Sequence, residues 1–266
     1  MEPHEQMLLI PIKVKALIAG NEKYSQTEFA GPTVNFSAVR QEENITIQTE
    51  PFTKHSQLEK GVHLHWFLPE YLVHGVKEAE EEDVKYPYLP DRWIVTRVEI
   101  RQGFFNQRKI CCKSFQIESN AVSNENSVYN DGSIRVPVES GNWFLGRSGE
   151  YGRLPAGGIY AEELTADSYG EPGFYAYYPN CRNVFGFYDA MEDVQEHSQL
   201  FYQVCGWFSK REHDPVGGLS GEALAERIKE MEFEFSRQVP RKGSLFWNPS
   251  GEGNALLLHG ACYGLV

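Results

Sequence analysis

Three histidines and a glutamate fall within fifteen residues, in the stretch GVHLHWFLPEYLVHG at positions 61–75. His63 and His65 are two residues apart, so a strand would place both imidazoles on one face. Glu70 and His74 follow closely. Two imidazoles and a carboxylate can bind a divalent ion such as iron, manganese or zinc. These residues are therefore candidate metal ligands, with His74 as a fourth.

The spacing from His63 to Glu70 resembles the centre of the cupin metal motif, HxH followed by a glutamate. The flanking glycines depart from that motif, because Gly61 lies too close to the first histidine and Gly75 too close to Glu70. The second cupin motif needs a further histidine, and Tyr160 stands at that place. A half-buried strand would have the same sequence pattern, so a structural role is the favoured interpretation. A cupin-like metal-dependent enzyme is the alternative.

A second candidate site is the aromatic stretch FYAYYPNCRNVFGFYD, which covers residues 174–189. Exposed tyrosines would form a stacking surface for a sugar or a partner protein, and Arg182 could bind a carboxylate. The candidate binding surface consists of Tyr175, Tyr177, Tyr178 and Arg182. The alternative is a hairpin whose second strand places Phe185 and Phe187 on one face. Cys181 has no histidine nominated as its catalytic base.

Composition and motifs exclude several other classes of function. The net charge is −12, which is unfavourable for binding nucleic acid. No nucleophile elbow, P-loop, dinucleotide fingerprint or HExxH motif occurs, so no catalytic or cofactor-binding residue is assigned. The five cysteines form no CxxC pair, which is typical of reduced thiols in a cytoplasmic protein. No signal peptide or membrane-spanning run is expected.

The elements that must position these residues are mostly short β-like runs separated by turn residues. Such runs occur at 8–20, 33–39, 44–49, 61–68, 92–100, 108–119, 133–139, 173–178, 183–189, 200–209, 244–247 and 255–264. One stretch differs, because apolar residues recur at helical spacing between charged ones. It predicts a helix over about 221–236, after Ser220 as its N-cap. A short helical turn is expected within 68–75. The fold class is mainly β, an antiparallel sandwich or irregular barrel with one notable helix near 221–236.

Several stretches in fixed order carry a family resemblance. They are GVHLHWFLPEYLVHG, YPYLPDRWIVTR, YPNCRNVFGFYD, CGWFS and LLLHGACYG. Together they resemble the N-terminal region of large uncharacterised bacterial proteins, which brings no function with it. The resemblance implies that residues 1–266 form a single β-rich module of a longer protein. The apolar end of the chain, Ala255 to Val266, agrees with that expectation.

These observations predict a non-enzymatic protein interaction or assembly module. Its expected partner is another protein surface or the rest of its own chain, and self-association is a possible outcome. Two alternatives stay open. One is the cupin-like enzyme that uses His63, His65 and Glu70, and the other is a carbohydrate-binding module that uses the aromatic residues of 174–188. An exposed sheet edge or apolar face would favour the interaction module.

Overall fold

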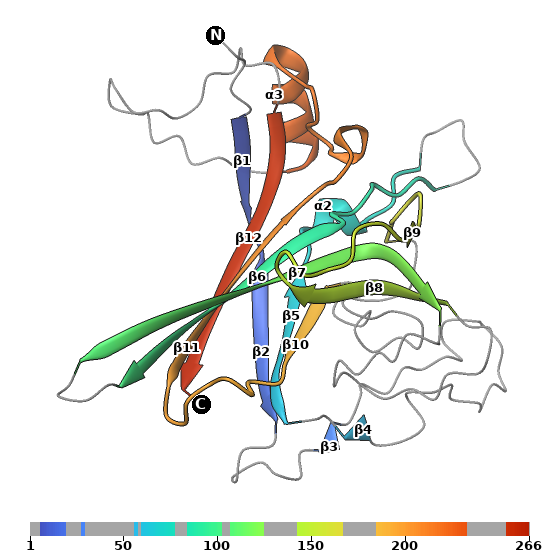
Figure 1. Cartoon of the computed structure of the whole chain (residues 1–266). Helices are drawn as coiled ribbons and strands as arrows, with labels where there is room; N and C mark the ends of the chain where they lie inside the picture. Colours follow the sequence, from blue (N-terminus) through green and yellow to red (C-terminus); the bar gives the residue numbers. More distant parts are fainter. Residues whose placement is uncertain are drawn as a thin grey trace, which may run out of the picture.

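A computed structural model of the chain describes residues 6–19, 28–29, 56–57, 60–77, 84–102, 107–124, 143–166, 185–232 and 254–265. In these residues the protein is mainly β, as the sequence predicts, and its two packed sheets form no closed barrel, a choice that the sequence left open. Figure 1 shows the long strands of one sheet crossing over the shorter strands of the other.

The larger sheet has the strand order β1-β12-β11-β6-β7-β8, and β9 also pairs with β7. These strands are β1 (Gln6–Pro11), β6 (Arg92–Gln102), β7 (Arg108–Asn124), β8 (Trp143–Glu150), β9 (Ile159–Tyr160), β11 (Gln199–Trp207) and β12 (Asn254–Leu265). Every pairing in it is antiparallel except that of β1 with β12, which is parallel. The first and last strands of the chain therefore lie side by side.

The smaller sheet has the order β10-β5-β2, and both of its pairings are antiparallel. Its strands are β2 (Lys13–Ala19), β5 (Gly61–Phe67) and β10 (Gly186–Asp189). Two short strands, β3 (Glu28–Phe29) and β4 (Ser56–Gln57), pair separately. The histidine stretch thus supplies the central strand of the smaller sheet.

The core lies between the two sheets and is built by alternate residues of their strands. Trp66 on β5 and Trp93 on β6 are fully buried, and their ring centroids are 5.1 Å apart. Phe187 on β10 packs against Phe115 on β7 at 4.6 Å. Gly206 on β11 gives the Trp93 ring its space, because a Cβ there would lie 2.1 Å from a ring carbon. The two sheets therefore share one core in the manner of a sandwich.

The run from residue 8 to residue 20 is not one strand, contrary to the sequence prediction. It divides at Pro11, where β1 ends in the larger sheet and β2 begins in the smaller one. Ile12 between them donates its backbone N–H to the carbonyl of His259 at 2.7 Å. Pro11 itself has no backbone N–H to donate to a neighbouring strand. It is therefore suited to the position where the chain passes from the larger sheet to the smaller one.

The helices lie together beside the sandwich. The predicted turn is α2 (Glu70–Val73), the predicted helix is α3 (Gly221–Glu230), and η3 (Arg211–His213) is a single 3₁₀ turn. Arg227 of α3 donates to the Tyr71 hydroxyl of α2 at 3.0 Å. The expected end near residue 236 was wrong, because the helix stops at Glu230. Buried Met231 caps it, and Glu232 has a left-handed φ of 55° that cannot continue a helix.

Candidate functional site

The histidine pair lies on the face of the smaller sheet that points away from the core. His63 is buried and stacks on Tyr188 of β10, with 4.7 Å between ring centroids. Their neighbours Val62, Leu64 and Trp66 point into the core instead. The two faces of this strand are therefore divided as the alternation of the sequence predicts.

His65 is held in its neutral form. Burial and, to a smaller extent, the nearby His63 lower its pKa from 6.5 to about 4. Glu70 begins α2, where it and His74 are exposed to solvent. Among the described residues, no three His, Cys, Asp or Glu side chains gather as ligands for a metal ion. A divalent metal at His63, His65 and Glu70 stays a prediction.

The aromatic stretch is described only from residue 185 onward. Tyr175, Tyr177, Tyr178 and Arg182, the candidate binding surface, lie outside the described residues, as does Cys181. Phe185 and Phe187 share a face as predicted, and both are buried in the core. Tyr188 faces the other way and donates its hydroxyl to the carbonyl of Lys60 at 2.7 Å.

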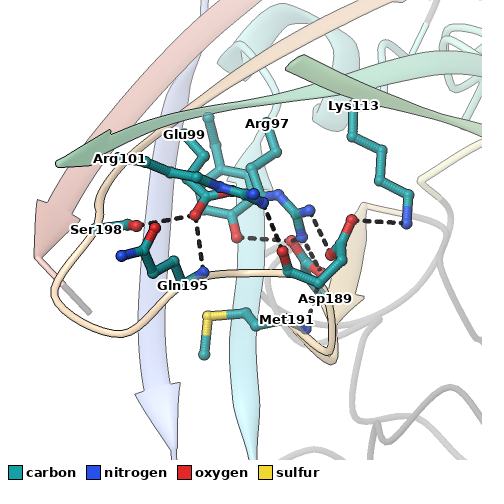
Figure 2. A network of polar contacts seen from close by, with 10 residues as sticks. Arg97, Glu99, Arg101, Lys113, Asp189, Met191, Gln195 and Ser198 are labelled. Atoms are coloured by element: carbon teal, nitrogen blue, oxygen red, sulfur yellow. Dashed lines mark hydrogen bonds and ion pairs between the residues drawn. The ribbon is translucent and has the colours of Figure 1, made fainter. Parts of the chain in front are cut away.

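A buried ionic network joins the two sheets near one end of β10 (Figure 2). Arg97 of β6 donates to both carboxylate oxygens of Asp189 at 2.9 and 2.8 Å, and Tyr202 of β11 donates to the same carboxylate at 2.8 Å. All three side chains are buried. Because Asp189 ends a strand of the smaller sheet, this ion pair fixes one sheet against the other.

The same network fastens the loop of residues 190–198 beneath β6. Glu99 accepts hydrogen bonds from the Ser198 hydroxyl and the Gln195 backbone N–H, both at 2.8 Å, and from Arg101 at 2.8 Å. Burial alone would raise the pKa of Glu99, but these donors hold it below its usual value. Asp193 in the loop pairs with Arg97 and Lys113. Every charged member has a partner of opposite sign, which indicates a structural clamp.

A second polar cluster surrounds a bulge in β7. The register of β7 against β8 shifts between Glu118 and Val122. Arg147 of β8 pairs with Glu118 and donates to the Tyr160 hydroxyl at 2.8 Å. Arg92 lies over the Tyr160 ring at 5.1 Å, and Arg147 lies 5.5 Å from it. Tyr160, which stands where a cupin histidine would be needed, is thus held between two guanidinium groups.

The outer face of the larger sheet is the surface that turns away from the shared core, and over four adjacent strands it carries no Lys, Arg, Asp or Glu. We define it as every second residue in 94–100 of β6, 110–116 of β7, 199–207 of β11 and 255–263 of β12, together with Met7 and Leu9 of β1. In each strand the intervening residues point into the sandwich. A chain in which 23% of residues are charged rarely leaves so wide a face without Lys, Arg, Asp or Glu.

Large apolar side chains of this outer face are open to solvent. Met7 is 60% exposed, Leu9 56%, Ile110 64%, Phe201 37% and Tyr263 88%. Lone exposed apolar residues are ordinary, but these five lie on one face of one sheet. They form a surface whose composition is that of the centre of a protein interface.

The register places part of this surface in a single row across four strands. Tyr263 lies opposite Phe201, Phe201 opposite Val98, and Val98 opposite Cys112. Cys112 is exposed and its thiol is free. Arg92 and Glu118 flank the outer face at one end of the sheet, and Arg108 flanks it at the other. The middle of the face holds uncharged polar side chains, among them Thr96, Ser114 and Gln203, so the face as a whole is uncharged and only partly apolar.

The sequence contains a signal for this face, which is the position of the charged residues along each strand. In RWIVTRVEI the two charges that enter the core, Arg97 and Glu99, are in phase with Trp93. The opposite phase, from Ile94 to Ile100, is uncharged. The strand QLFYQVCGW repeats this arrangement, with Tyr202 on the inner face and Phe201 on the outer one.

In the described part of the chain, no helix has both the length and the apolar character needed to cross a membrane. Comparison of the chain with protein-family models, with curated proteins and with solved structures finds no match.

Proposed function

We propose that this chain is a non-enzymatic interaction module that binds another protein surface through the outer face of its larger sheet. The observation that carries the proposal is the charge-free outer face, on which five large apolar side chains are exposed. Burial of such a surface against a partner releases water and supplies a driving force of about 25 cal/mol per Å². The buried ionic networks support the same function, because they stiffen the sheet that presents the face.

The proposed setting is a reducing compartment, the cytoplasm of a bacterial cell, within a larger protein. The described cysteines support this, since Cys111, Cys112, Cys205 and Cys262 are free thiols. The larger bacterial protein is inferred from the sequence motifs alone.

Cys112 offers a direct test, because its exposed thiol lies within the outer face. The rate of its alkylation by a maleimide is measured by peptide mass spectrometry, in dilute purified protein and in intact cells that naturally make the protein. A Val76→Cys variant gives a matched control, since Val76 is 58% exposed and lies outside the strands of the larger sheet.

We expect the ratio of Cys112 labelling to control labelling to fall severalfold in cells, because a docked partner covers the outer face. Phe201→Arg should restore the labelling of Cys112 in cells, since a charge buried without a partner disfavours docking. An equal ratio in cells and in dilute solution would show that the outer face is not occupied, and the proposal would be wrong.

A further inference from the structure

We propose that the partner seated on the outer face is a second copy of this chain, related to the first by a two-fold axis. This inference rests on the proposed function and names its partner. It makes the protein a symmetric homodimer in which two larger sheets pack face to face.

The distribution of charge is the first argument. The chain carries a net charge of −12, so most approaches of two copies bring acidic surface against acidic surface. In a two-fold interface the residues at the axis meet their own symmetry mates, and any charge there meets its like. The outer face has no Lys, Arg, Asp or Glu between its flanking residues, Arg92 and Glu118 at one end and Arg108 at the other. A face for a basic or acidic partner would have no reason to avoid charge.

The extent of the surface is the second argument. The five side chains with exposed fractions from 37% to 88% present roughly 500–700 Å² per copy. A standard protein interface covers about 800 Å² on each partner. Partly exposed neighbours such as Leu257 and Val98 supply the remainder. The exposed apolar area of the face therefore approaches the size of a standard interface and lies at or above the upper end of the range for the largest apolar patch of a monomer.

The residue row across the sheet permits a crosslinking test whose product requires two copies of the chain. Tyr263 and Cys112 are separated by three strand spacings, which is roughly 14 Å. Let the two-fold axis lie in the interface, parallel to the strands and above the midpoint between Phe201 and Val98. Residue 263 of one copy then lies opposite Cys112 of the other. Sheets packed face to face are about 10 Å apart, which is too far for a disulfide but within reach of a short bis-maleimide.

The first measurement is the mass of the purified full chain in solution, by light scattering across a dilution series. We expect a dimer that dissociates on dilution, and a monomer for Tyr263→Glu and Phe201→Glu. The matched control Val76→Glu should remain dimeric, because Val76 is exposed and lies outside the strands of the larger sheet. Circular dichroism should be unchanged in all three variants. A wild-type chain that is monomeric throughout the series would overturn the proposal of a second copy.

The second measurement is crosslinking of a Tyr263→Cys variant with a short bis-maleimide, followed by a denaturing gel and peptide mass spectrometry. We expect a covalent dimer linked through residue 263 and Cys112, and its loss when Cys112→Ser is added. Failure to form this link in a dimeric protein would overturn the two-fold arrangement. The proposed function has a separate outcome: a monomer whose Cys112 is nevertheless shielded in cells docks a different partner, and only the second copy is then wrong.

Discussion

At the scale of single residues, Arg97 and Asp189 form the most deeply buried ion pair of the described residues. Both side chains are buried, with exposed fractions of 3% and 6%. A buried charge is costly unless its partner stays in place, because little water can solvate it. The pair adds orientation as well as charge, since the guanidinium contacts both carboxylate oxygens. Its role is to fix β10 of the smaller sheet against β6 of the larger one.

Arg97→Met should therefore lower the free energy of unfolding by about 3–5 kcal/mol, because Asp189 is left buried without its cation. Urea denaturation measures the loss. Arg101→Met is the control and should cost less than half as much, since Arg101 is 28% exposed and Glu99 keeps two other donors. Adding Asp189→Leu to Arg97→Met should recover part of the loss. Equal effects of the two arginine substitutions would contradict the clamp.

His65 makes stability depend on pH. Its folded pKa of about 4 lies below the unfolded value of 6.5, so the unfolded chain binds the extra proton. The contribution is complete above pH 6.5 and is lost as the pH falls toward 4, by at most about 3 kcal/mol. His65→Gln should flatten the change in urea midpoint between pH 6.5 and 5 relative to wild type. An identical slope in both proteins would show that His65 does not titrate as described.

At the scale of elements, β1 is an edge strand whose alternate residues have opposite environments. Ile10 is 3% exposed and points into the core, whereas Leu9 is 56% exposed on the outer face. The strand pairs in parallel with β12, and parallel pairs are normally covered on both faces. Its outer residues are open, which agrees with an outer face that is covered by association.

Adjacent substitutions in β1 test that division. Ile10→Ala should cost about 2–5 kcal/mol of unfolding free energy, because it leaves a cavity in the core. Leu9→Ala should cost less than about 1 kcal/mol in the dissociated chain, since that side chain is already in water. Both values come from chemical denaturation at high dilution. A larger loss for Leu9 than for Ile10 would place β1 in the opposite orientation.

At the scale of the whole molecule, the two sheets depend on one core. Trp66 belongs to the smaller sheet, Trp93 to the larger one, and their rings are in contact. Neither sheet can bury its apolar face without the other. We expect unfolding followed by tryptophan fluorescence and by far-ultraviolet circular dichroism to give coincident transitions in urea. Two separated transitions would mean that the sheets unfold independently.

The sequence by itself determined the local features. Alternation predicted the strands, the common face of His63 and His65, and the common face of Phe185 and Phe187, because side chains alternate along any strand. Helical spacing predicted α3, although its end depended on Met231 and Glu232. The metal ligands and the tyrosine surface remain predictions, since spacing specifies a shared face but not what gathers there.

Only the tertiary structure decided which strands are neighbours and which face of each meets water. The order β1-β12-β11-β6-β7 joins strands from opposite ends of the chain, and no local pattern contains that order. RWIVTRVEI illustrates the limit, because both of its faces hold apolar residues and its inner one also holds Arg97 and Glu99. These two charges are tolerated inside because other segments of the chain supply their partners, Asp189 for Arg97 and Ser198 for Glu99. Cross-strand pairing alone places Tyr263, Phe201 and Cys112 in one uncharged row.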